Sequence, residues 1–137
     1  MVALPAAMRV LTDPAECGPV TLALPQDAPG WIETELCVRP EFPDRFRLSL
    51  SLHCEQRGGD VEFQLLLRTA DPDDFYWGRV LPGPADNDDW EQGFDSTELV
   101  AVGCPRWDRV ETLVLRGKQK GRDAVRLDLG RVAIHHH

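Results

Sequence analysis

Four tryptophans in a chain of 137 residues are the side chains that most clearly suggest a ligand. The face of an indole ring carries a negative π surface, on which the C–H groups of a sugar ring can pack. Two of these rings have acids or amides beside them in the sequence, in DPDDFYW and DNDDWEQ. Such polar neighbours suit sugar hydroxyls. We therefore expect a polysaccharide or oligosaccharide site made of Tyr76, Trp77, Asp88, Trp90, Gln92 and Trp107.

Two other interpretations of these residues stay open at this stage. The rings could pack in the core or at strand ends, as large aromatic side chains commonly do. The acids Asp86, Asp88 and Glu91 offer hard oxygen ligands for calcium, but their spacing is not that of an EF-hand loop, and a solvated acidic loop fits them better. No other cofactor is expected.

Catalysis would need a nucleophile with a base, or two facing carboxylates. Apart from three histidines at the end, His53 is the only imidazole, and neither GxSxG nor HExxH occurs. The sequence thus predicts a protein that is not an enzyme. The basic run RGKQKGR, residues 116–122, could bind an anion or form a solvated hairpin tip.

The charge of the chain limits the classes of partner, and its cysteines bear on disulfides and metal sites. The formal net charge is −8 at pH 7, which disfavours a nucleic-acid backbone or an anionic membrane. No apolar run has the roughly 20 residues that span a bilayer. The four cysteines form no CxxC pair, and Cys37 and Cys54 lie in strand-like runs where a buried apolar role competes with a disulfide. The compartment stays open, and would be extracellular for a carbohydrate-binding protein.

Alternation with period two dominates the sequence from Trp31 onward and predicts half-buried strands. In RFRLSLSLHC, one face carries Phe46, Leu48, Leu50, Leu52 and Cys54. The glycine turn RGGD follows, and then VEFQLLLR places Val61, Phe63, Leu65 and Leu67 on one face. These two runs predict an antiparallel hairpin.

Further strands are expected in WIETELCV, DFYWGRVL, RVETLVLRG and AVRLDLGRVAI, with a long polar loop over residues 82–98. Many short strands between turn clusters indicate an all-β protein, an antiparallel β-sandwich of jelly-roll type. Residues 1–134 then form one domain, and His135, His136 and His137 resemble the remnant of a purification tag.

The opening of the chain differs from the rest. ALPAAMRVL predicts a short N-terminal helix, and GPVTLALP predicts an apolar strand that the sandwich could use at an edge. The words AMRVLTDPAECGPVTLALPQD resemble a segment of the trihydroxycyclohexanedione hydrolases, which belong to the thiamine-diphosphate enzyme superfamily. The GDG and NN cofactor motif of that family is absent, so the resemblance implies a foreign or recombined segment over residues 1–27 rather than thiamine chemistry.

The β region, in the order FRLSLSLHCEQRGGDVEFQLLLRT, WEQGF, LVLRG and VRLDLGRVAI, resembles jelly-roll carbohydrate-binding modules. The resemblance implies non-catalytic binding of a polysaccharide through surface aromatics. It also implies a calcium ligand at Asp128 in RLDLG, although the N-terminal partners expected for that ligand are missing. Two alternatives remain: a protein-interaction sandwich without a small ligand, and an artificial or recombined chimeric β domain. A foreign edge strand could also drive dimerisation through strand exchange.

Overall fold

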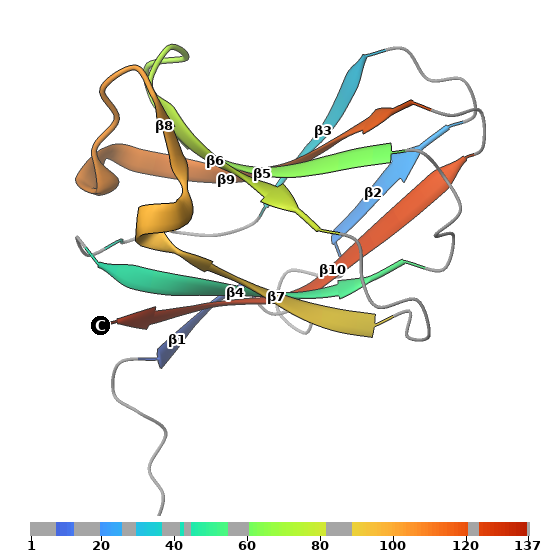
Figure 1. Ribbon diagram of the computed structural model, residues 1–137, viewed down its shortest axis with the longest axis horizontal. Coiled ribbons are helices and arrows are strands. Elements are labelled where there is room, and N and C mark those ends of the chain that lie inside the picture. The colour runs from blue at the N-terminus through green and yellow to red at the C-terminus, as the bar shows by residue number, and fades with distance from the viewer. Residues whose placement is uncertain are drawn as a thin grey trace, which may run out of the picture.

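The computed structural model describes residues 8–12, 20–25, 30–36, 42, 45–54, 61–81, 89–120 and 124–136. These residues form two antiparallel β-sheets packed face to face, which appear as the lower and upper layers of Figure 1. The prediction of an all-β antiparallel sandwich is therefore confirmed.

Sheet A, the lower layer, has the order β1-β10-β4-β7, and β2 pairs with β10 beyond the end of β1. As expected for GPVTLALP, β2 lies at an edge, since β10 is its one partner among the described strands. The strands of sheet A are β1 (Met8–Thr12), β2 (Val20–Leu24), β4 (Phe46–His53), β7 (Asp89–Asp95) and β10 (Val125–His136).

Sheet B, the upper layer, has the order β3-β9-β5-β6-β8. Its strands are β3 (Trp31–Glu35), β5 (Val61–Thr69), β6 (Phe75–Val80), β8 (Val100–Val102) and β9 (Val110–Gln119). Two short 3₁₀ helices, η1 (Ser96–Glu98) and η2 (Trp107–Arg109), flank β8 in the chain.

The strand pairs are nested along the chain in the manner of one long folded hairpin. β5 pairs with β6, β4 with β7, β3 with β9 and β2 with β10. Successive pairs alternate between sheet B and sheet A, and the pairs β5–β9 and β4–β10 join them side by side. This winding is that of a jelly roll, with β1 and β8 as additional strands.

The hairpin expected from β4 and β5 is wrong. β4 pairs with β10 and β7 in sheet A, whereas β5 pairs with β6 and β9 in sheet B. Both strands are amphipathic and bury their apolar faces in the same core from opposite sides. The prediction of a solvated hairpin tip over residues 116–122 is also wrong for its first residues. Arg116 belongs to β9 and is paired there with β3 and β5.

Two further segments differ from expectation. Part of the expected polar loop is the strand β7, whose Trp90, Gln92 and Phe94 share one face in register with β4. Part of the expected N-terminal helix is the strand β1, because β10 extends to His136 and offers backbone partners to Met8–Thr12. Residues 3–7, the turn RGGD and residues 82–88 lie outside the described part of the chain.

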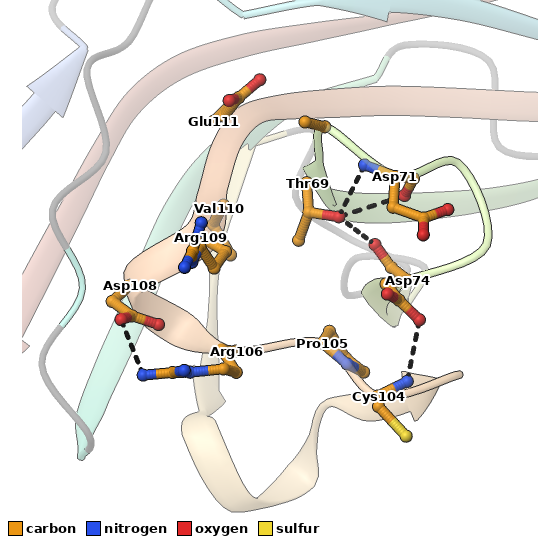
Figure 2. Close-up of a pocket in the computed structure, with 11 residues that line it drawn as sticks. Thr69, Asp71, Asp74, Cys104, Pro105, Arg106, Asp108, Arg109, Val110 and Glu111 are labelled. Atoms are coloured by element: carbon orange, nitrogen blue, oxygen red, sulfur yellow. Dashed lines mark hydrogen bonds and ion pairs between the residues drawn. The ribbon is translucent and has the colours of Figure 1, made fainter.

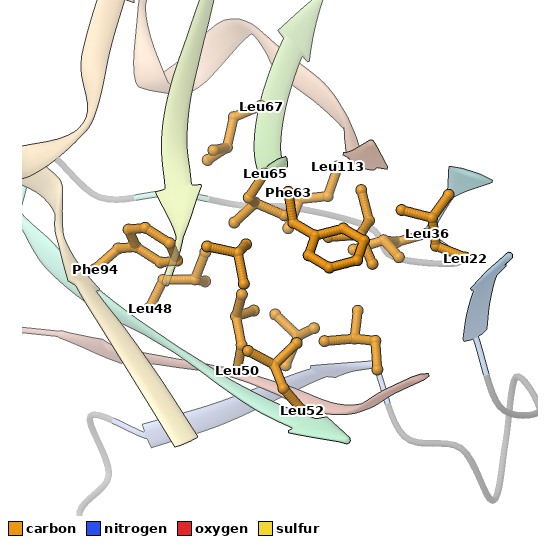
Figure 3. Packing of buried hydrophobic residues seen from close by; sticks show 14 of the residues in the cluster. Leu22, Leu36, Leu48, Leu50, Leu52, Phe63, Leu65, Leu67, Phe94 and Leu113 are labelled. Carbon is orange, nitrogen blue, oxygen red and sulfur yellow. The ribbon is translucent and has the colours of Figure 1, made fainter. Parts of the chain in front are cut away.

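The core lies between the two sheets and consists mainly of leucine, as Figure 3 shows. The predicted inward faces of β4 and β5 are confirmed, since Leu48, Leu50, Leu65 and Leu67 are at most 1% exposed. Cys54 is buried in the same cluster, as expected, whereas Cys37 is not among the described residues.

Candidate functional site

Tyr76 and Trp107, two of the expected ligand-binding residues, stack on each other at one end of the core. Their ring centroids are 3.5 Å apart and nearly parallel, and Phe46 meets Trp107 edge-on at 4.8 Å. The Tyr76 hydroxyl donates to the carbonyl oxygen of Pro105 at 2.8 Å. Burial raises the pKa of Tyr76, with a further contribution from Asp108. Because Tyr76 is only 8% exposed, these two rings close the sandwich and offer little surface to a sugar.

Trp90 and Gln92 also face inward, from β7. Trp90 lies opposite Leu52 in register and packs against the core, and its Nε1 atom is buried with no hydrogen-bond partner among the described residues. The Gln92 amide spans the gap between the sheets: its oxygen accepts from the Leu81 N–H at 2.7 Å and its nitrogen donates to the Arg79 carbonyl at 2.9 Å. Both side chains hold β7 to the rest of the fold. Asp88 is outside the described residues.

Trp77 is the one expected residue that the structure places on an outer face. It alternates along β6 with the core residues Tyr76 and Gly78, and lies in register between Leu66 of β5 and Val100 of β8. The five expected residues that the structure describes are thus not brought together on one surface, because adjacent residues in a strand point to opposite sides of the sheet.

A second outward tryptophan, Trp31, was not among the expected site residues. It begins β3 on the same outer face of sheet B, beside the exposed residues Glu33 and Glu35. The signal was present in the sequence: Trp31 has the same parity as these two glutamates and the opposite parity to Ile32. Trp31 and Trp77 lie outside the core cluster, whereas Trp90 and Trp107 pack against it.

We call the whole outer face of sheet B the B-face. The half of the B-face formed by β6 and β8 is mainly apolar. Phe75 and Trp77 are half-buried there, and they flank the exposed side chains of Val100 and Val102. The remaining exposed large apolar residue in the described part of the chain, Leu81, directly follows β6 and by alternation points to the same side. Exposed apolar side chains that gather on one face indicate an interaction surface.

The other half of the B-face is polar and ordered by hydrogen bonds. The Arg116 guanidinium lies over the Trp31 ring, 4.3 Å from its centroid. Its Nε and Nη2 atoms donate to the Gln64 side-chain oxygen at 2.9 and 2.6 Å. Arg68 donates to Glu33 at 2.5 Å across the same face. Burial lowers the pKa of Arg116, although a guanidinium keeps its charge at neutral pH.

The outer face of sheet A carries a different set of groups, around a hollow of about 440 Å³. His53 Nδ1 lies 2.6 Å from the Asp89 carboxylate, and Thr21 donates to Asp128 at 2.7 Å. Burial acts to raise the pKa of Asp128, but hydrogen bonds from Thr21 and Arg126 and nearby positive charge lower it overall. The described residues contain no cluster of His, Cys, Asp or Glu suited to a metal, so calcium at Asp128 gains no support.

A second hollow, of about 580 Å³, lies at the loops that join β5 to β6 and β8 to β9 (Figure 2). Its polar groups are used to hold these loops. Thr69 Oγ1 donates to the Asp74 carbonyl at 2.7 Å, and the Asp74 carboxylate accepts from the Cys104 N–H at 2.9 Å. Gly103, at φ 72°, passes so close to Asp74 that a side chain would collide with it. The B-face is therefore the better candidate site.

No family model matches the chain, and no curated protein matches it either. Among the described residues, no helix has the length and apolar character needed to cross a membrane. The candidate site is therefore supported by its geometry alone.

Proposed function

We propose that this chain is a non-catalytic carbohydrate-binding module that binds a polysaccharide on the B-face. The observation that carries the proposal is the placement of Trp31 and Trp77 on one sheet surface, with amide and guanidinium groups between them. Aromatic rings contribute packing area to sugar rings, and fixed polar groups select among hydroxyls.

The spacing of the two rings favours a polymer over a single sugar. Trp31 is on β3 and Trp77 is on β6, three strand steps away in the order β3-β9-β5-β6. With strands about 4.8 Å apart, the rings are roughly 14 Å apart across the sheet. An offset along the strands, from Glu62 to Leu66 in the register of β5, adds to this separation. A ligand that contacts both rings must therefore be an extended chain of several sugar residues.

The experiment is affinity electrophoresis of Trp77→Ala and Trp31→Ala against soluble xylan, β-glucan, mannan and pectin. Each variant should weaken retention on the polymer that binds by more than about tenfold, because truncation of a central aromatic contact removes a large share of binding energy. Both rings are outside the core cluster, so the variants should remain folded.

Glu91→Ala is the matched control, since Glu91 is exposed on the outer face of sheet A. Its retention should equal that of the parent protein. If the double variant at Trp31 and Trp77 binds as the parent does, the B-face is not the sugar site.

The aliphatic side chains of the B-face favour a second candidate, a protein-interaction module. Val100 and Val102 are 46% and 36% exposed and belong to the short edge strand β8. Sugars gain less from aliphatic contacts than from aromatic ones, whereas protein partners use both. A folded protein that is retained on no polymer would shift the assignment to this alternative.

A further inference from the structure

Charge is divided unevenly between the two outer faces of the sandwich. Among the described residues, the B-face carries the cations Arg68, Arg79, Arg116, Lys118 and Lys120. Its carboxylates are Glu33, Glu35 and Glu62. Among the described residues, the outer face of sheet A carries the carboxylates Asp89, Glu91, Asp95 and Asp128 together with the cations Arg47, Arg126 and Arg131, so acids outnumber cations there. In a chain with a net charge of −8, the B-face is thus locally cationic.

Gln64 lies at the centre of this cationic region. It is in register with Arg116 of β9 on one side and with Arg79 of β6 on the other. Its side chain is only 7% exposed, and its oxygen accepts both hydrogen bonds from Arg116. Since an amide has two N–H donors, the Gln64 nitrogen still has donors to offer, and no described residue accepts from it.

Arg79 has most of its donor capacity available. Its side chain is 60% exposed, and its ion pair with Glu62, the one it forms within the described part of the chain, has a long separation of 3.6 Å. Arg79 and Arg116 stand on the two strands that flank β5, so their Cα atoms are roughly 10 Å apart. Both long side chains can therefore reach a group that lies above Gln64.

The aromatic rings lie next to the same row of donors. Trp77 precedes Arg79 by two residues on β6, on the same side of the sheet, and Trp31 lies under Arg116. A guanidinium binds a carboxylate through two parallel N–H···O bonds, which a neutral hydroxyl cannot match. The site thus combines ring surfaces with a row of donors suited to an anion.

We propose that the polysaccharide is acidic, with a uronic acid carboxylate bound by Arg79, Gln64 and Arg116 and with neighbouring sugar rings on Trp77. This inference rests on the proposed function and names the class of its ligand. The net charge of the chain repels a polyanion from other surfaces, so the acidic polymer is directed to this one face.

The test compares polygalacturonate with the same polymer after full methyl esterification, by isothermal titration calorimetry. Esterification removes the charge and leaves the sugar rings unchanged. The free acid should bind about tenfold or more tightly than the ester, because hydrogen bonds to charged groups are the strong ones. Added salt should weaken binding of the free acid and leave the ester unaffected.

Arg79→Gln should remove this preference for the free acid, and Arg79→Lys should retain only part of it. Arg106→Gln is the control, because Arg106 is similarly exposed at 68% and lies away from the B-face. Equal binding of acid and ester by the parent protein, abolished for both by Trp77→Ala, would overturn the acidic ligand and leave the proposed function standing. A folded parent protein that binds neither these polymers nor the neutral ones would overturn both proposals.

Discussion

Gly78 lies at a point where the core has no room for a side chain. A Cβ atom there would be 2.6 Å from Phe94 Cε1 and 2.8 Å from Leu99 Cδ2. Both neighbours are buried, so they cannot move aside without disturbing the packing between the sheets. Gly78→Ala should lower the free energy of unfolding by about 1–3 kcal/mol, measured by urea denaturation.

Gly130→Ala provides the comparison at the residue scale. Its nearest neighbour would be Ser51 Cβ at 3.5 Å, which is an ordinary contact. The free energy of unfolding should change by less than about 1 kcal/mol. If the two alanine variants were equally stable, tight packing at Gly78 would not be the reason for glycine there.

The tryptophans show what could be predicted at this scale. Parity within a strand puts Trp31 on the side of Glu33 and Trp90 on the side of Phe94, a signal not used in the prediction of the site, and the structure has the first side outward and the second inward. Closeness in sequence was the misleading signal. Tyr76 and Trp77 are neighbours in the chain and therefore lie on opposite sides of sheet B.

At the scale of elements, the alternating pattern predicts strands and their buried faces well but does not predict their partners. β4 and β5 would show the same alternation in a hairpin as in two facing sheets, since each needs one apolar side in either case. The partners of β4 are β10 and β7, which are distant in the sequence. Burial of one common core selects this pairing, and no local pattern records it.

The side chain of Gln92 links the edge strand β7 to sheet B by two hydrogen bonds. Arg79 lies near the end of β6, and Leu81 directly follows β6. The Arg79 carbonyl and the Leu81 N–H both form hydrogen bonds with the Gln92 amide. Gln92→Ala should lower the free energy of unfolding by no more than about 0.5–1.5 kcal/mol for each of the two hydrogen bonds, because water can replace the amide as a partner. The direct readout is hydrogen exchange, in which the Leu81 amide should lose its protection.

Glu91→Ala serves as the neighbouring control for this element. Glu91 points outward from the same strand, so the Leu81 amide should exchange as slowly as in the parent protein. Fast exchange at Leu81 in the parent protein would show that the Gln92 link is not maintained in solution.

At the scale of the whole molecule, the charge and apolar patterns of the two outer faces arise only when strands from distant parts of the chain pair. Arg79, Gln64 and Arg116 lie on three different strands, and only the order β9-β5-β6 sets them in one row. The basic run that contains Arg116 was visible in the sequence as a candidate for binding an anion. Its partners Gln64 and Arg79 were not, since nothing local connects them.

The strand β2, which lies within the segment predicted to be foreign, is part of this whole and not an appendage. Leu22 and Leu24 of β2 are each 1% exposed and pack in the core between the sheets. Leu22→Ala and Leu24→Ala should each lower the free energy of unfolding by about 2–5 kcal/mol. The free energy of unfolding of an ordinary domain is about 5–15 kcal/mol. The double variant should therefore lose cooperative thermal unfolding, whereas Ala23→Ser, at an exposed position of the same strand, should melt as the parent protein does. If the double variant unfolds at the parent temperature, β2 is a dispensable addition and the sandwich is complete without it. Loss of cooperativity would mean instead that the segment, whatever its source, supplies a strand that this core requires.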